Sequence, residues 1–237
     1  VHPDPTLGQT MEIARQMEEF QPDTVIAIGG GSAMDAAKIA RYIYEYSLEQ
    51  EPGFLESYEK VSELFTRLQQ KFVDIRKRIV KFHHGTHTKL FCIPTTSGTG
   101  SEVTPYAVIT DDNTRVKYPL TDYEMTPQVA IVDPEFVMTV PKRTVAWSGL
   151  DTLSHALESY VSVMASDFTR PWSLQAIKLV FENLEKSYNY DPKNPTLEGE
   201  TARENMHYAA TLGGRAFANA FLGINHSLAH KTGGEFG

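Results

Sequence analysis

The apolar run Thr24–Ile28, followed at once by three glycines, constrains the fold of this chain more than any other segment. A short continuous apolar run is typical of a strand buried on both faces of a parallel sheet. Gly29–Ser32 then forms a glycine turn, and the pattern of Ala33–Tyr46 predicts a helix. Strand, glycine turn and helix are the first half of a βαβ unit, so we expect an α/β fold with a Rossmann-like parallel sheet.

The segments around this unit extend the α/β pattern. An amphipathic helix is expected over Thr6–Phe20, with Asp4 as its N-cap and Pro5 at its first helical position. A second buried strand is expected at Lys89–Ile93, and the charged residues 47–88 predict one or two surface helices inserted between the two strands. Further strand-like segments follow at Tyr106–Thr110, Arg115–Tyr118 and Val129–Val132.

The pattern changes after Pro141, where almost every segment has helical periodicity. The expected helices are Thr144–Val163, Trp172–Ser187, Glu198–Asn219 and Gly223–Lys231. We therefore predict an α/β dinucleotide-binding domain over residues 1–142 and an all-helical metal-binding domain over residues 143–237. Because the chain starts at Val1 and ends at Gly237 in a small-residue turn, we expect a partial sequence, truncated at both ends.

Charge and cysteine content exclude several classes of protein. A net charge of −8 disfavours a nucleic-acid backbone as the partner, since such binders cluster Lys and Arg. No apolar run approaches the roughly 18 residues of a membrane span, and no signal-peptide pattern is present. The single cysteine, Cys92, lies in an apolar strand, where we expect inert core, and fits a reducing, cytoplasmic compartment.

Two loops at strand ends are candidates for binding a phosphate group. In Gly29–Ser32 the backbone N–H groups could approach a pyrophosphate at a helix N-terminus, or the glycines could simply form a tight turn. Asp35 could complete a helix cap. The Thr95–Ser101 loop concentrates hydroxyls, which suits phosphate or ribose oxygens, although a polar turn is the alternative. Two such loops after two apolar strands favour a ligand, because ligands sit beyond the carboxyl ends of parallel strands.

Two pairs of metal-ligand residues stand four positions apart on predicted helices. Asp151 with His155, and His226 with His230, each stack on one helix face, as metal ligands or as structural pairs. Two pairs in one small helical domain favour the metal, and carboxylate with imidazole suits Fe(II), Zn or Mn. A denser histidine cluster lies in a polar connection, where we expect a solvated loop. That cluster is His83, His84 and His87.

Five motifs, in order along nearly the whole chain, resemble the iron-dependent alcohol dehydrogenases, whose fold is related to that of dehydroquinate synthase. They are Pro3–Leu7, Ile28–Asp35, Pro94–Thr104, Gly149–Ala156 and His226–His230. Phe72–Ile79 is similar, more narrowly, to the alcohol dehydrogenase half of the fermentative bifunctional aldehyde/alcohol dehydrogenases.

The resemblance implies a role for each candidate residue. NAD would be bound by Gly30, Gly31, Ser32, Asp35, Thr95, Thr96, Thr99 and Ser101, with Lys117 on the nicotinamide side. The catalytic metal, Fe(II) with Zn as the alternative, would be bound by Asp151, His155 and His226. His230 would serve in proton transfer. The family's fourth metal ligand, a histidine in a Pro-His-Gly turn, would lie beyond Gly237.

The implied activity is reversible hydride transfer between a short primary alcohol and NAD, giving the aldehyde. One alternative is another member of the superfamily, such as a glycerol dehydrogenase. A second is a non-catalytic role in assembly, because the bifunctional relatives form filaments. For the full-length protein the resemblance implies a homo-oligomer or filament that binds neither nucleic acid nor membrane.

Overall fold

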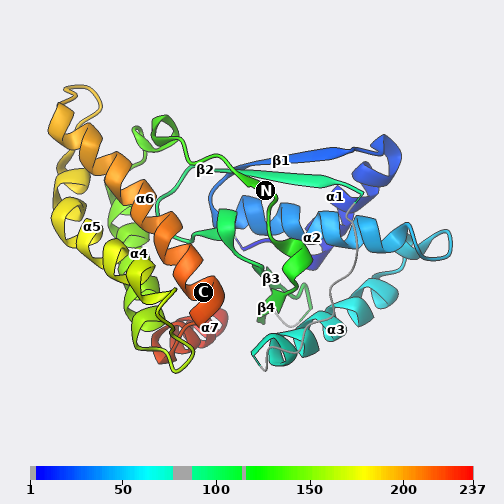
Figure 1. The fold of residues 1–237 in the computed structure, drawn as a ribbon. Helices are drawn as coiled ribbons and strands as arrows, with labels where there is room; N and C mark the ends of the chain where they lie inside the picture. The colour runs from blue at the N-terminus through cyan, green and yellow to red at the C-terminus, as the bar shows by residue number, and fades with distance from the viewer. Residues whose placement is uncertain (1–3, 77–86, 114–115, 237) are drawn as a thin grey trace.

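The computed structural model describes residues 4–76, 87–113 and 116–236. Within these ranges strands and helices alternate up to residue 141, and helices follow from Lys142 onward. The α/β part and the helical part lie beside each other: the helices α4, α5 and α6 are on one side, and the sheet with α1, α2 and α3 is on the other (Figure 1). A parallel sheet followed by a helical region is the architecture that the sequence predicts.

The parallel sheet has the order β1-β2-β5. β1 (Thr24–Gly29) pairs along its whole length with β2 (Lys89–Pro94), and β2 pairs with the short β5 (Val129–Ala130). The helix α2 (Gly31–Ser47) begins directly after β1 and packs against β1 and β2, which completes the βαβ unit. This topology brings the loops that follow β1 and β2 to the same edge of the sheet.

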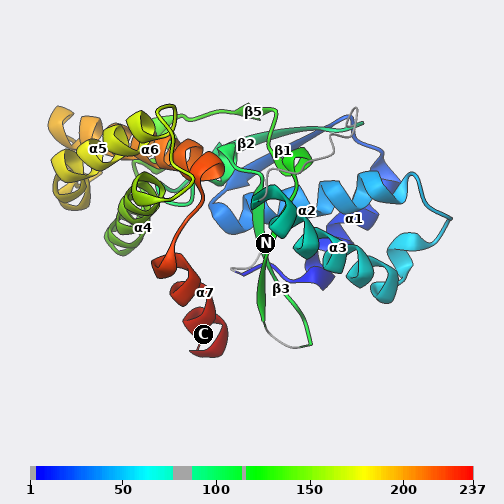
Figure 2. The same cartoon turned by 60° about the horizontal axis from the view of Figure 1, so that its bottom comes forward.

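Below the sheet, an antiparallel hairpin and two more helices enclose the main core. The hairpin joins β3 (Tyr106–Thr110) to β4 (Lys117–Thr121), α1 (Leu7–Phe20) packs on α2, and α3 (Tyr58–Arg76) packs on β4 (Figure 2). The core between them consists of buried aliphatic, methionine and aromatic side chains. Its members include Leu7, Met11, Ile39, Ile43, Ile109 and Leu120.

The helical region is a three-helix bundle with a fourth helix that leaves it. α4 (Lys142–Val161), α5 (Arg170–Asn189) and α6 (Leu197–Ala220) pack on one another. The last helix, α7 (Ile224–Phe236), projects away from this bundle toward β3 and β4 (Figure 2). No helix in the described ranges combines the length and the apolar composition needed to cross a membrane.

The predicted N-cap of the first helix is wrong by two residues, although the helix starts within one residue of its predicted position. Thr6, not Asp4, is the N-cap: its hydroxyl accepts from the Gln9 N–H, and the Gln9 side chain accepts from the Thr6 N–H. Asp4 instead forms an ion pair with Lys117 on β4, at 2.9 Å. A reciprocal capping box satisfies two helix-end donors at once, which explains why the hydroxyl of Thr6 prevails over the nearby carboxylate.

The expectation that β1 is buried on both faces is also wrong. α2 covers one face, where Ala27 is buried, but Ile26 and Ile28 on the other face are 60% and 56% exposed. The prediction that this segment forms a strand was correct, because a run of apolar residues favours a strand within a sheet. The burial prediction failed because, in the described part of the chain, a helix packs on only one face of this strand.

The α/β region and the bundle touch through two glycines. Gly100, in the loop after β2, has a φ of +62°, and a Cβ built on it would lie 2.6 Å from the Cα of Gly214 on α6. A Cβ on Gly214 would in turn lie 2.9 Å from the Cα of Gly100. Backbone packs directly on backbone here, so neither position accepts a side chain without a shift of the chain.

This contact predicts that Gly214→Ala destabilises the protein while its neighbour Gly213→Ala does not. We expect the first change to lower the free energy of unfolding by about 1–3 kcal/mol, as overpacking does. A Cβ on Gly213 meets nothing closer than 3.6 Å, so its replacement should be neutral or stabilising, since alanine favours a helix. Urea unfolding of the full-length protein measures both, and equal effects would refute the backbone contact.

Candidate functional site

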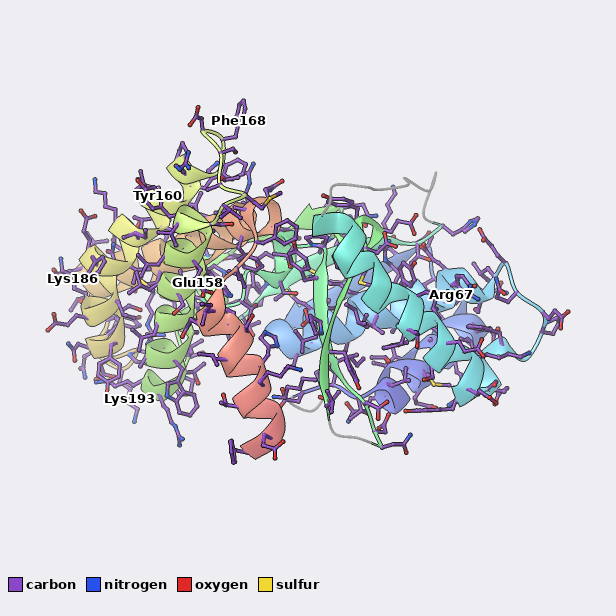
Figure 3. The ribbon with its side chains drawn as sticks, turned by 90° about the horizontal axis from the view of Figure 1, so that it is seen from below. Arg67, Glu158, Tyr160, Phe168, Lys186 and Lys193 are labelled. Carbon is purple, nitrogen blue, oxygen red and sulfur yellow. The ribbon has the colours of Figure 1, made fainter. Side chains whose placement is uncertain are left out.

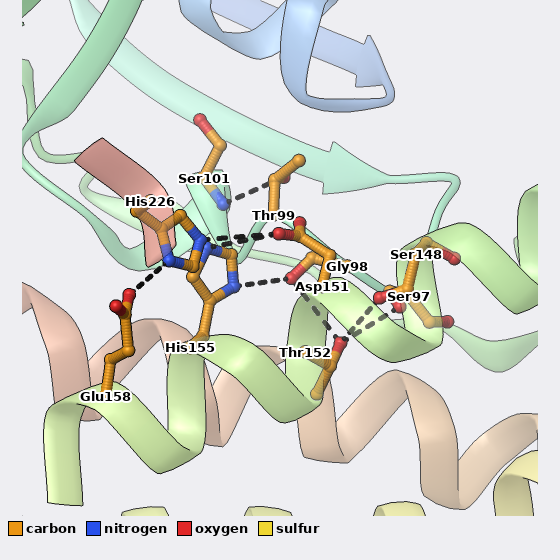
Figure 4. Close-up of polar contacts among 10 residues, drawn as sticks. All are labelled: Ser97, Gly98, Thr99, Ser101, Ser148, Asp151, Thr152, His155, Glu158 and His226. Carbon is orange, nitrogen blue, oxygen red and sulfur yellow. Dashed lines mark hydrogen bonds and ion pairs between the residues drawn. The ribbon is translucent and has the colours of Figure 1, made fainter. Parts of the chain in front are cut away.

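Two helices bring together three side chains that offer metal-ligand atoms. Asp151 and His155 lie one turn apart on α4, and His226 reaches them from the first turn of α7 (Figure 4). The Nε2 atoms of His155 and His226 are 3.6 Å and 3.5 Å from the same Asp151 oxygen, Oδ1. One ligand atom from each residue lies within 4.8 Å of the others, so a single ion could contact all three.

The remaining ring nitrogens of the two histidines are each held by an oxygen. His155 Nδ1 lies 3.2 Å from the carbonyl oxygen of Gly98, and His226 Nδ1 lies 2.5 Å from Oε2 of Glu158. The two imidazoles stack with their centroids 4.5 Å apart. With Nδ1 engaged as a donor, each ring presents an Nε2 lone pair to the centre of the cluster, which is the usual arrangement of metal-binding histidines.

Charge and burial also suit a cation at this position. Burial lowers the pKa of His155 to about 4, so its imidazole is neutral and able to act as a ligand. Burial raises the pKa of Asp151, but the neighbouring His155 and His226 outweigh this, and the carboxylate pKa is lowered. Burial lowers the pKa of His226, but hydrogen bonds to Asp151 and Glu158 outweigh this and raise it. Two imidazoles and one carboxylate are a donor set that fits Fe(II) or Zn(II).

The two glycine and hydroxyl loops meet at the carboxyl ends of β1 and β2. The N–H of Thr95 donates to the carbonyl of Gly29 at 2.9 Å. A Cβ on Gly31 would lie 2.7 Å from Cγ2 of Thr99, so the glycine allows one loop to approach the other. Gly30 is the N-cap of α2 and has no side chain to satisfy the first N–H groups of that helix. Such a helix start suits an anionic group.

Asp35 and Ser101 face the protein interior rather than the loop surface. The Ser101 hydroxyl donates to Oδ1 of Asp35 at 2.6 Å, and the Val108 N–H donates to Oδ2 at 2.9 Å. The buried ammonium of Lys38 donates to the Ser101 hydroxyl at 2.8 Å. Burial raises the pKa of Asp35 and lowers that of Lys38, and their mutual attraction opposes both shifts. Asp35 therefore does not complete a cap of α2, which was one interpretation of its position in the sequence.

Lys117 on β4 lies close enough to α7 for its charge to act on His230. A Cβ on Gly233 of α7 would lie 3.9 Å from Nζ of Lys117. The pKa of His230 is lowered, first by burial and then by the positive charges of His226 and Lys117.

Two further predictions concern residues outside this site. Of the histidine cluster expected in a solvated loop, His87 is exposed, and His83 and His84 lie outside the described residues. Cys92 is fully buried with its pKa raised to about 12, which confirms inert core.

One buried histidine beside the loop was not anticipated. His207, on α6, is 1% exposed, and its Nδ1 lies 3.1 Å from the hydroxyl of Ser97. Burial lowers its pKa to about 4. Glu158 follows His155 by one helical turn, so its spacing could have suggested a place on the same helix face, whereas only the tertiary neighbours of His207 reveal it.

Comparison with known proteins agrees with this geometry. The family model "Iron-containing alcohol dehydrogenase" matches residues 1–134, and the model "Fe-containing alcohol dehydrogenase family, C-terminal" matches residues 145–237. The chain belongs to the iron-containing alcohol dehydrogenase family. The resemblance drawn from the motifs is thereby confirmed.

Relatives in this family include proteins with one and with two activities. The chain is 54% identical to aldehyde-alcohol dehydrogenase 2 of Entamoeba histolytica and 50% identical to the bifunctional aldehyde-alcohol dehydrogenase of Escherichia coli K12. All of this chain is matched in both, but only 25% and 24% of those proteins. It is also 42% identical to the NADPH-dependent butanol dehydrogenase of Clostridium saccharobutylicum, of which it covers 53%. The chain thus spans about a quarter to a half of these relatives.

Solved structures of the family share the fold. The iron-containing alcohol dehydrogenase of Thermococcus thioreducens is 33% identical and superposes with a TM-score of 0.77, over 98% of this chain and 54% of that one. Sulfoacetaldehyde reductase of Bifidobacterium kashiwanohense, in complex with NAD⁺, is 28% identical with a TM-score of 0.77 and the same coverage. The α/β sheet with a helical domain is therefore the family's fold.

Buried neutral histidines predict that the protein loses stability in mild acid. His207 keeps a pKa of about 4 when folded but an ordinary value near 6.5 when unfolded, so the unfolded chain binds more protons between these values. The free energy of unfolding should fall as pH drops from 6.5 to 4, with about 1 kcal/mol per pH unit from this group. His207→Asn, which can still bond to Ser97, should flatten the dependence in urea unfolding at pH 7 and 5. An unchanged slope would show that His207 does not titrate as described.

Proposed function

We propose that this chain forms the core of a metal-dependent alcohol dehydrogenase that interconverts a short primary alcohol and its aldehyde with NAD(H). One observation carries the proposal: the loop that lines the dinucleotide edge of the sheet also holds a metal-ligand histidine, through the contact between the Gly98 carbonyl and His155. A hydride acceptor and a Lewis acid would thus be placed at one loop, as alcohol oxidation requires.

In this proposal Asp151, His155 and His226 hold Fe(II), and Zn(II) competes for the same donors. A bound metal supplies Lewis-acid stabilisation of the alcohol oxygen, and the nicotinamide supplies the hydride acceptor. The chain's own groups orient these partners. His230, one turn beyond His226 on α7, transfers the proton released when the alcohol is oxidised.

The α/β part, residues 1–142, would bind the dinucleotide, and residues 143–237 would bind the metal. Gly30, Gly31 and Ser32 at the start of α2 hold the pyrophosphate, because backbone N–H groups and the helix dipole favour anions there. Thr95, Thr96 and Thr99 line the cofactor, and Lys117 approaches the nicotinamide side. Asp35 and Ser101 act instead by shaping the loop, since they already bond to each other.

The full-length protein would combine this activity with an aldehyde dehydrogenase activity. Two relatives that match the whole chain are aldehyde-alcohol dehydrogenases by name, and the present residues would be one section of such a protein. We place it in the cytoplasm as a homo-oligomer or filament. A glycerol dehydrogenase-like activity is the competing enzyme, and turnover of ethanol against glycerol separates the two.

The metal assignment predicts that Asp151→Ala and His155→Ala abolish stoichiometric metal binding in the full-length protein. Each change removes one of the three ligands proposed among the described residues, so we expect at least a tenfold loss of affinity and loss of alcohol oxidation. Metal analysis after gel filtration measures the first effect directly. His87→Ala, at an exposed histidine outside the cluster, is the matched control and should keep its metal. Wild-type metal content in Asp151→Ala would exclude the assignment.

The cofactor assignment predicts that Gly31→Ala weakens NAD binding. Its new methyl group would press on Thr99, 2.7 Å away, and move two of the proposed contacts at once. We expect roughly a tenfold rise in Kd, about 1.4 kcal/mol, with metal content unchanged. Fluorescence titration with NAD and with NADP measures this and shows which cofactor is preferred. Unaltered affinity for both would contradict the proposed loop.

A further inference from the structure

Glu158 stands where α4 meets the start of α7, one turn beyond His155 (Figure 3). We propose that Glu158 is a positioning residue: its carboxylate caps α7 and orients His226, so that metal binding and the docking of α7 become a single event. This inference rests on the proposed metal site and adds a residue outside the set of ligands.

The first support is that both carboxylate oxygens are engaged by α7. Oε1 accepts the N–H of Asn225 at 2.7 Å, and Oε2 lies 2.5 Å from Nδ1 of His226. The N–H of Gly223 also donates to this carboxylate. The side chain is only 14% exposed. A negative charge that accepts free N–H groups at a helix N-terminus stabilises that helix, and here the same group holds a ring of the metal cluster.

The second support is that α7 has few other anchors in the described part of the chain. Its large apolar residues face solvent: Ile224 is 77% exposed, Leu228 59% and Phe236 83%. A helix of 13 residues is only marginally stable without tertiary contacts. The contacts at its first turn, through Glu158 and His226, therefore carry much of its attachment to α4.

The third support is the close fit of the chain at Gly223. A Cβ on this residue would lie 2.8 Å from Oε1 of Glu158. Alanine at this position would push the carboxylate away from α7 without removing its charge. The carboxylate is the end of a flexible side chain, so the fold can tolerate this displacement while the orientation of His226 changes.

The two proposed histidine ligands are oriented by different kinds of group. His155 is held by a backbone carbonyl, that of Gly98, on a tightly packed loop. His226 is held by a charged side chain that also starts the helix carrying His226. The tautomer and ring orientation of His226 thus depend on whether α7 is docked. Because α7 also carries His230, docking would bring the proposed proton-transfer group into place with the metal.

The test uses the full-length protein with Glu158→Ala, Glu158→Gln and Gly223→Ala. Zn(II) affinity is measured by chelator competition, and hydrogen exchange is followed in peptides covering residues 224–236. We expect Glu158→Ala to lose 10–100-fold in affinity, the usual effect of removing a group that orients a ligand. Glu158→Gln keeps one acceptor oxygen and should lie between Glu158→Ala and wild type. Exchange in α7 should slow on metal addition in wild type and much less in Glu158→Ala.

Glu182→Ala is the matched control, because Glu182 is a half-exposed glutamate on α5, away from the metal cluster, that lies 4.0 Å from Lys178. It should leave both measurements unchanged. Wild-type metal affinity in Glu158→Ala, alongside loss of binding in Asp151→Ala, would overturn this inference and leave the metal site standing. Absence of metal binding by the wild-type protein would instead overturn the proposed function. If Glu158→Ala does not fold, Gly223→Ala decides: a weaker metal affinity supports the inference and an unchanged one refutes it.

Discussion

The direct backbone contact between Gly100 and Gly214 is the constraint on which the rest of the site depends. It sets the distance between the loop after β2 and the helical bundle, and without a side chain at either position the loop lies against α6 and α4. At that distance the carbonyl of Gly98 reaches His155, and the hydroxyl of Thr152 donates to the carbonyl of Ser97 at 3.1 Å. A loop belonging to the sheet thereby orients a ligand belonging to the bundle.

The opposite side of the same loop is fixed by buried polar groups. The ammonium of Lys38 donates to the hydroxyls of Ser101 and Thr104 and to the carbonyl of Tyr106, which ties α2 to the loop and to β3. Thr211 on α6 donates to the buried carboxylate of Glu102 at 2.7 Å. Buried charges are costly unless they are fully bonded, so these groups hold the loop in one conformation. A preorganised loop suits a site where cofactor and metal must meet with little freedom.

Most elements could be predicted because their signals are local. The apolar run of β1 and the helical periodicity after Pro141 survive in the structure with most ends displaced by at most two residues, while the last helix continues five residues beyond its predicted end, to Phe236. The failures have tertiary causes. Ile26 and Ile28 are exposed because, in the described residues, a helix covers only one face of β1. Asp35 turns inward because Ser101 and Val108, both distant in sequence, donate hydrogen bonds to its carboxylate.

By itself, the sequence determined the residue types and the local spacing: a glycine turn after a strand, a hydroxyl loop after another, and two ligand pairs four positions apart on helices. That spacing is sufficient to stack Asp151 and His155 on one face, because a helix repeats every 3.6 residues. The spacing did not show that His226 joins them, which only the family resemblance implied; the tertiary structure brings His226 to them across 71 positions of chain from His155. Only the tertiary structure decided that Gly98 and Glu158 hold the two imidazoles. Local periodicity does not show which helices pack against each other. The small residues at the contact allow two backbones to approach closely, and this effect exists only in the packed structure.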